Sequence, residues 1–352
     1  MASPGNYLIW AHVTHMVPKL GFIFSTIFGS ILLFLNILGA QKNFGSYKYL
    51  ISAITVLGMT FSAAEILVYP NVHNFNAGSL FFSFQESLGL SGVWRNMPLA
   101  GYTFFHCATM AVLSVQFIYR YWAVFDTNKL KYFKGSYALI WLIYCSYLGF
   151  QYSIGTYYFF MRDPVSDEYF RKEIFLRYNA NISELPAMVI LAYDPNNGSV
   201  RWWNLMGILN ICAIVNFQYG IMIYCGWSMQ NKMEDKIKNL SETLRKRHKQ
   251  FFKTLVIQIT TPTIILFIPL TVMICLPILN LNVRFPSGIM LCSFTLYPAM
   301  DSIIVMSVVS EYRHTVKRYF KLLSRRFSGT YNNKVSISAV SGTSMAATSG
   351  VN

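Results

Sequence analysis

Long windows without charge alternate with short basic segments along this chain. Five windows contain no Asp, Glu, Lys or Arg, and they cover residues 20–41, 96–119, 135–161, 202–231 and 254–283. Each window is long enough for one helix across the hydrocarbon core of a bilayer, which takes about 20 apolar residues, and too short for two. Two further apolar segments, about 48–69 and about 287–310, each hold one acid, Glu65 and Asp301.

This pattern predicts an all-α membrane protein, a bundle of seven transmembrane helices. The spans are expected at about 18–40, 48–69, 98–122, 137–160, 203–228, 252–278 and 287–310. An eighth span over 71–85 is not expected, because its asparagines, histidine and glycine disfavour insertion in lipid. The seven spans and the segment after them are expected to form one domain over 1–327, followed by a disordered Ser/Thr-rich tail over 328–352.

Composition excludes an ordinary soluble protein. Of the 352 residues, 54% are hydrophobic and only 12% are charged, whereas soluble domains carry about a quarter charged residues. The net charge of +15 indicates attraction to anionic lipid and acidic partners rather than to nucleic acid. The six cysteines all lie in expected spans and lack metal-ligand spacing, so neither a disulfide nor a metal or other cofactor is expected.

The distribution of Lys and Arg predicts the orientation in the membrane. With seven spans, 21 of the 29 Lys and Arg lie on the side of the C-terminal tail, which should therefore be cytoplasmic. The N-terminus is then outside. The loop 161–202, which carries the glycosylation sequons at Asn181 and Asn197, is outside as well.

Two basic segments on the expected cytoplasmic side have helical patterns. Residues 231–253, which include Arg245, Lys246 and Arg247, should extend the fifth and sixth helices, and a solvated linker is the alternative. Residues 311–327 should form a basic amphipathic helix on the membrane surface.

Prolines and buried acids mark candidate switch positions. Pro262 and Pro269 should kink the sixth span and make it a lever. An acid inside a membrane helix is costly, so Glu65 and Asp301 are functional candidates. For Glu65, near the outer end of its span, an interface-facing carboxylate and a role in a pocket are both open. Asp301 lies deeper by roughly 15 Å, so a direct pair with Glu65 is not expected.

Five motifs occur in order and at suitable intervals over about residues 15–320. They are GSYKYLI (45–51), QFIYRYWAV (116–124), IYCGW (223–227), PTIILFIPLTVM (262–273) and CSFTLYPAMD with EYR (292–313). Together they resemble the nematode Str-type serpentine chemoreceptors, the group that includes the diacetyl odorant receptor.

The resemblance implies a seven-helix G-protein-coupled receptor in the ciliary membrane of chemosensory neurons. Its ligand would be an odorant or another small external cue, and its partner a heterotrimeric G protein. Arg120 matches the arginine of the family's YRYxA segment, and Tyr297, Pro298 and Asp301 match its YPxxD segment. Ser302 stands where the family often has a proline, which puts the hinge geometry of this segment in doubt. The tail would be open to phosphorylation by a kinase and to an arrestin.

Tyr119, Arg120 and Tyr121 are expected to couple the receptor to its G protein, with the basic residues at 245–247. Tyr119 replaces the acid that precedes the arginine in rhodopsin-like receptors, so the resting partner of Arg120 should be a carbonyl, a hydroxyl or a more distant acid. The alternative is that Arg120 is a positive-inside anchor.

The ligand pocket is expected in the outer halves of the helices. Candidate lining residues are Tyr102, Phe105, His106 and Asn210, with Glu65 as a further possibility, although aromatic residues in a bundle more often serve packing. Many aromatics and few buried charges favour a small, uncharged, partly apolar ligand. The rival functions are a ligand-gated ion channel subunit and an intramembrane enzyme or transporter. The sequence has no HExxH motif that would indicate an intramembrane enzyme and no inverted repeat that would indicate a transporter, so no enzyme is expected.

Overall fold

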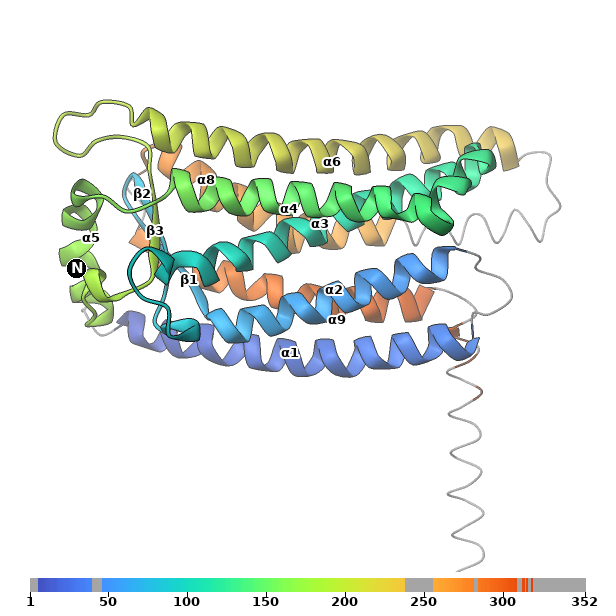
Figure 1. The fold of residues 1–352 in the computed structure, drawn as a ribbon, viewed down its shortest axis with the longest axis horizontal. Coiled ribbons are helices and arrows are strands. Elements are labelled where there is room, and N and C mark those ends of the chain that lie inside the picture. Colours follow the sequence, from blue (N-terminus) through green and yellow to red (C-terminus); the bar gives the residue numbers. More distant parts are fainter. Residues whose placement is uncertain are drawn as a thin grey trace, which may run out of the picture.

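The computed structural model describes residues 6–39, 46–237, 256–281 and 284–308, and singly 312, 313, 315 and 318. The described chain is mostly helical, as predicted, and its long helices run side by side (Figure 1). The bundle comprises α1 (Asn6–Gly39), α2 (Tyr47–Val68), α3 (Met97–Phe125), α4 (Leu139–Phe159), α6 (Trp202–Ile237), the helix Val256–Ile278 with α8 (Ile268–Ile278), and α9 (Gly288–Val308). Within the described residues, every one of these except α4 is both long and apolar enough to cross a membrane.

The centre of the bundle is α3, which contacts α2, α4 and α6. Most of its length is buried, and it carries small residues such as Cys107, Ala108 and Ala111 where the neighbouring helices approach. Small side chains allow this closeness in membrane bundles. The outer helices instead expose large apolar side chains, among them Phe34, Ile143 and Phe217, as a lipid-facing surface requires.

The structure adds a β-sheet that the all-α prediction lacked. The strands are β1 (Pro70–Phe75), β2 (Gly78–Ser83), β3 (Ala187–Leu191) and β4 (Arg284–Phe285). They form an antiparallel sheet in the order β3-β2-β1-β4, which closes one end of the bundle (Figure 1). The segment 71–85, discounted as a span, is therefore a hairpin, and its turn residue Asn76 has a positive φ of 50°.

The sheet is one layer of a two-layer roof, and we call this end of the molecule the roof end. Its outer layer is α5 (Pro164–Tyr178), whose Phe170 and Ile174 pack on the side chains of Leu80, Phe82 and Val189. Residues next to these in the strands point the other way, into the bundle, as the period of two in a strand requires. Gly78 is needed under α5, because a Cβ there would lie 2.7 Å from the Phe170 ring.

Local signals explain where α5 begins and how it is held. Asp163 caps its N-terminus by accepting from the backbone N–H of Ser166 at 2.9 Å, and Pro164 occupies the first turn. The fully buried His73 of β1 lies between Tyr178, at 3.2 Å, and Glu173, at 3.5 Å. Burial opposes ionisation of Glu173, but His73 and Arg177 outweigh it and hold the pKa of this carboxyl below its usual range.

Several short elements connect the helices. These 3₁₀ turns are Ser87–Gly89, Gly92–Asn96, Thr127–Phe133, Gly135–Ala138 and Ile182–Glu184. In the sixth span, Pro262 is followed by a π-helical segment, Thr263–Phe267, before α8 continues with Pro269 in its first turn. A proline lacks the N–H of a regular helix, and a π-helical turn is a known consequence of such disruption.

The predicted extension of the fifth helix into 231–253 is seen, because α6 continues to Ile237. The remainder of this segment, including Arg245, Lys246 and Arg247, lies outside the described residues. So do most of the predicted amphipathic helix at 311–327 and the whole tail 328–352.

Candidate functional site

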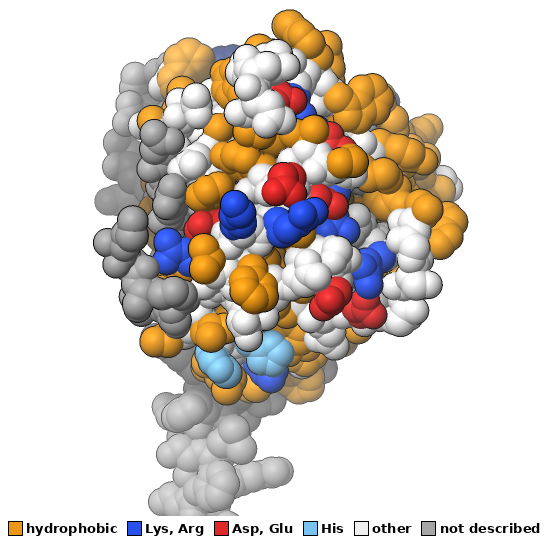
Figure 2. All heavy atoms as spheres, turned by 90° about the vertical axis from the view of Figure 1, so that its left-hand side faces the viewer, with side chains coloured by type: hydrophobic (Ala, Val, Ile, Leu, Met, Phe, Trp, Pro, Cys, Tyr) orange, Lys and Arg blue, Asp and Glu red, His pale blue; other side chains and the backbone are white. Residues whose placement is uncertain are grey.

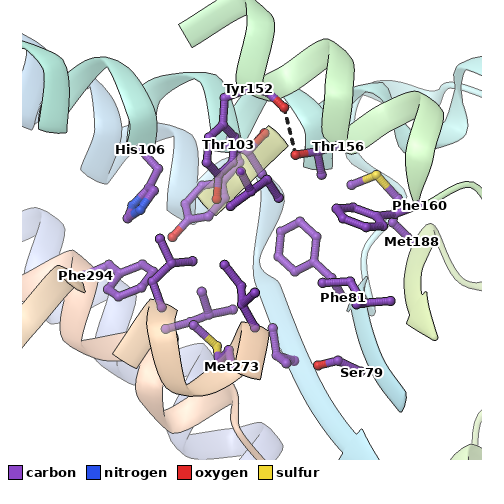
Figure 3. A pocket seen from close by; sticks show the side chains of 17 residues that line it. Ser79, Phe81, Thr103, His106, Tyr152, Thr156, Phe160, Met188, Met273 and Phe294 are labelled. Atoms are coloured by element: carbon purple, nitrogen blue, oxygen red, sulfur yellow. Dashed lines mark hydrogen bonds between the residues drawn. The ribbon is translucent and has the colours of Figure 1, made fainter. Parts of the chain in front are cut away.

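A cavity of about 90 Å³ lies directly beneath the roof (Figure 3). Its walls come from both the sheet and the bundle. The lining residues are Val72, Ser79, Phe81, Tyr102, Thr103, His106, Tyr152, Thr156, Phe160, Met188, Ile190, Ile211, Leu270, Met273, Ile274, Leu291 and Phe294. Most are apolar or aromatic, which is typical of a site for a small organic molecule.

His106 is the most distinctive polar group of this cavity. Its ring stacks on Phe294 with the ring centroids 4.7 Å apart. Among the described residues, no side chain or backbone group hydrogen bonds to either ring nitrogen. Buried polar groups normally have partners, so the imidazole can donate to or accept from a molecule in the cavity.

Two of the cavity hydroxyls already donate to their own helices. Thr103 Oγ1 donates to the carbonyl oxygen of Ala100 at 2.7 Å, and Thr156 Oγ1 donates to that of Tyr152 at 2.8 Å. Each oxygen keeps a lone pair that can accept a hydrogen bond. Polar side chains are a minority of the lining residues, which suits a compact, mostly apolar molecule with one or two hydrogen-bonding atoms.

Glu65 lies just outside the cavity, with its side chain turned into the bundle. It is only 1% exposed, and its Oε1 accepts a hydrogen bond from Thr295 Oγ1 of α9. Tyr102, which lines the cavity, lies beside the same carboxyl group. The interface-facing alternative is therefore wrong for Glu65, and the residue supports the cavity wall from behind.

Of the four predicted lining residues, two line the cavity and two lie elsewhere. Tyr102 and His106 are four apart on α3 and share its cavity face, whereas Phe105 lies about 100° around the helix from His106 and packs edge-on against Phe104. Asn210 is also outside the cavity. Its Oδ1 accepts from Gln151 Nε2 at 3.1 Å in a groove between α4 and α6.

The roof residues Ser79, Phe81, Met188 and Ile190 were missed by reasoning from the sequence. A signal for them existed, because alternate positions of β2 and β3 face α5 on one side and the cavity on the other. Strands this short, however, give too few repeats to separate alternation from chance.

A second polar cluster surrounds Arg120, at the opposite end of α3 from the roof. Arg120 is only 3% exposed, and its Nε donates to the hydroxyl of Tyr47 at 2.9 Å. Gln116 Nε2 donates to the same hydroxyl at 3.1 Å, and Tyr119 stacks on the Tyr47 ring. Of the three kinds of resting partner considered for Arg120, the structure provides a hydroxyl.

A more distant acid is present as well. The buried carboxyl of Asp301 on α9 lies among Arg120, Tyr297 and Gln258. Gln258 belongs to the sixth span, so this cluster joins α3, α9 and that span. Tyr121 faces outward from it, toward Tyr224 of α6, with ring centroids 6.0 Å apart. The Arg120 guanidinium and the Asp301 carboxyl carry opposite charges and attract each other electrostatically within this cluster.

The YPxxD segment is tightly packed around Pro298. A Cβ on Gly58 of α2 would lie 2.9 Å from the Pro298 ring, so glycine permits the close approach of α2 and α9. Ser302 Oγ donates to the carbonyl oxygen of Pro298 at 3.0 Å. Ser302, which stands where the resemblance implied a proline in many members, therefore binds back to its own helix.

The glycosylation sequons lie at the roof end. Asn181 and Asn197 are both exposed, in the connections on either side of β3. Their position agrees with the accessibility that a glycan requires.

Comparison with known proteins identifies relatives over most of the chain. The family model described as "Serpentine type 7TM GPCR chemoreceptor Str" matches residues 14–317. The chain is 32% identical to "G-protein coupled receptor str-33" of Caenorhabditis elegans over 313 residues, which are 88% of this chain and 91% of the relative. It is 27% identical to "Serpentine receptor class r-10" of Caenorhabditis briggsae, covering 89% and 92% of the two chains.

Among solved structures, squid rhodopsin is similar, with a TM-score of 0.49 and 10% identity over 90% of this chain and 86% of that one. A likeness this distant adds nothing to the family match.

Proposed function

Since this chain belongs to the Str family of serpentine seven-transmembrane GPCR chemoreceptors, we propose that it detects a small external molecule in the roofed cavity and activates a heterotrimeric G protein at the opposite end. One observation carries the proposal: the same two helices line the cavity and carry the Arg120 cluster. His106 and Arg120 lie on α3, and Phe294 and Asp301 lie on α9. On α3 the two are about 21 Å apart along the axis.

The proposed orientation places the roof outside the cell and the Arg120 end in the cytoplasm. Support comes from the excess of Lys and Arg on the side of the C-terminal tail. The exposed sequons at the roof end fit the same orientation. The protein is a multi-pass membrane protein, and we infer the ciliary plasma membrane of a chemosensory neuron as its location.

The mechanism we infer is a population shift. A ligand moves the equilibrium only if it binds one helix arrangement better than another. A molecule touching His106, Met273 and Phe294 contacts α3, α8 and α9 at once, so it can favour one arrangement of these helices. The π-helical segment after Pro262 and the first-turn Pro269 provide the irregular backbone at which the sixth span can bend.

At the cytoplasmic end, the ends of the third, fifth and sixth helices then part. Tyr119, Arg120 and Tyr121 become accessible to the G protein, together with the basic residues Arg245, Lys246 and Arg247. The tail beyond 327 would take phosphates from a kinase and bind an arrestin.

Tyr47→Phe is expected to raise ligand-independent signalling severalfold. The change removes the hydroxyl that accepts from Arg120 and Gln116, but leaves the ring that stacks on Tyr119. A hydrogen bond to a charged group contributes about 1.5–3 kcal/mol, so its loss favours the arrangement in which Arg120 is released. Basal cAMP or calcium reporter signal, normalised to surface receptor, measures the effect. Tyr49→Phe, on the exposed face of the same helix, is the matched control. An unchanged basal signal in both variants would show that the Tyr47 hydroxyl does not hold Arg120 in the resting state.

The function itself is tested by expressing the full chain with a calcium or cAMP reporter and screening volatile and water-soluble small molecules. A ligand-dependent change that requires a G protein supports the proposal. A receptor that reaches the surface and never alters G-protein activity under any ligand counts against it, and a ligand-gated ion current without G protein would indicate the channel alternative. Glycosylation mapping at Asn181 tests the orientation separately.

A further inference from the structure

The roof closes the cavity from the end at which an external molecule would be expected to arrive. The sheet continues through β3, β2, β1 and β4 without a gap in its strand order. Its outer face is covered by α5 and sealed by a second apolar core that includes Leu80, Phe82, Phe170 and Val189. Figure 2 shows this outer face as continuous side chains, with no opening into the bundle among the described residues.

The side wall of the cavity is thinner than the roof. Leu270 and Ile274, one turn apart on α8, line the cavity and also line a neighbouring groove of about 320 Å³. The groove lies between α6 and the sixth span. Its other residues are Cys212, Val215, Asn216, Tyr219, Thr263, Phe267, Ile268, Thr271, Val272 and Cys275.

This groove faces the lipid. Ile268 is 52% exposed, and Asn216 and Thr271 are exposed as well, on helices long and apolar enough to cross a membrane. Leu270 and Ile274, which line both the groove and the cavity, are themselves buried. Two apolar side chains thus separate the cavity from the hydrocarbon region, whereas a whole sheet and a helix separate it from water.

The backbone beside this wall is suited to movement. The π-helical segment Thr263–Phe267 precedes α8 directly, and Pro269 adjoins Leu270. On the Arg120 side of these residues, α6 and the sixth span are held together by Tyr219, whose ring lies 4.3 Å from that of Phe267 and whose hydroxyl is 3.1 Å from Thr263 Oγ1. The two helices can therefore separate at Leu270 and Ile274 while they stay in contact at Tyr219.

We propose that small molecules reach the cavity sideways from the bilayer, between α6 and α8, past a gate formed by Leu270 and Ile274. The ligand class this route selects is uncharged and apolar enough to dissolve in lipid, because a charged molecule would have to leave water to reach the groove. That the cavity receives the receptor's ligand rests on the proposed function, whereas the route is a property of the structure and can be tested without any ligand.

The test places a thiol in the cavity with Thr103→Cys, in full-length protein reconstituted in phosphatidylcholine vesicles. The probe is uncharged methyl methanethiosulfonate, compared with its charged trimethylammonium-ethyl analogue. The rate at which position 103 is modified is followed by tandem mass spectrometry, because fragment ions distinguish position 103 from the native Cys107 on the same tryptic peptide. The uncharged reagent is expected to react at least about tenfold faster with this thiol than the charged one, after correction for their rates with a free thiol.

A matched pair of variants distinguishes the gate from the size of the cavity. Leu270→Ala and Leu291→Ala both shorten a buried leucine that lines the cavity, but only Leu270 also lines the groove. In the Thr103→Cys background, Leu270→Ala should accelerate modification by the uncharged reagent about tenfold, and Leu291→Ala should leave the rate unchanged. Circular dichroism and thermal unfolding of each variant verify that the bundle is intact.

The contrary outcomes are distinct. Equal acceleration by both alanine variants would show that cavity volume, not the gate, sets the rate, and no acceleration by either would exclude the route past Leu270. Modification by the charged reagent as fast as by the uncharged one would indicate an aqueous path through the roof. Because the readout needs no G protein, failure of the proposed receptor function leaves these results interpretable.

Discussion

Arg120→Ala is expected to abolish ligand-evoked G-protein signalling. Arg120 joins α3 to Tyr47 of α2 and lies beside the buried Asp301 of α9, so it is the charged centre of the cluster that the proposed activation opens. Signal from a calcium or cAMP reporter, divided by surface receptor, measures the loss. Lys129→Ala is the matched control, because this lysine lies near the same end but is exposed and pairs only with the partly exposed Asp126 among the described ion pairs.

The same change should also lower surface expression, for a reason that only the structure provides. Removing Arg120 takes away the cation that acts electrostatically on the buried Asp301 carboxyl, and a buried charge without such compensation is destabilising. The double variant Arg120→Ala with Asp301→Asn is therefore expected to recover surface expression without recovering signalling. A double variant that signals normally would return Arg120 to the role of a membrane-edge anchor.

Thr103→Phe is expected to raise the ligand concentration for half-maximal response about a hundredfold. A phenyl ring in place of the threonine side chain occupies much of a cavity of about 90 Å³, so the ligand loses space and contacts there. A loss of about 2.8 kcal/mol in binding free energy corresponds to a hundredfold in affinity. The measurement is a dose–response curve for whichever ligand the reporter screen identifies.

The control for this variant is a threonine-to-phenylalanine substitution outside the cavity. Thr60→Phe makes the same substitution at a threonine on the exposed face of α2, where a larger apolar side chain meets lipid. It should reach the surface and respond like the native protein. An unchanged dose–response in Thr103→Phe, with normal surface expression, would show that the ligand binds elsewhere.

The candidate site was only partly predictable. Tyr102 and His106 could be placed on one face by their spacing, but which face of α3 meets the cavity depends on how the neighbouring helices pack, so Phe105 was included wrongly. Asn210 was included wrongly for a similar reason, because its amide oxygen accepts from Gln151 of α4 and does not face the cavity. Tyr47 lies 73 residues before Arg120 in the chain, and no local pattern relates them.

The sequence by itself determined the helices and the proposed direction of insertion, because both follow from local averages: about 20 apolar residues span a bilayer, and Lys and Arg accumulate on one side. Five motifs in register likewise predicted the family that the comparisons show. Only the tertiary structure decided the roof, the cavity, the gate and the partners of Arg120. Each of these joins segments far apart in the chain, as when β2 pairs with β3, and depends on the rotation of each helix about its axis, which packing sets.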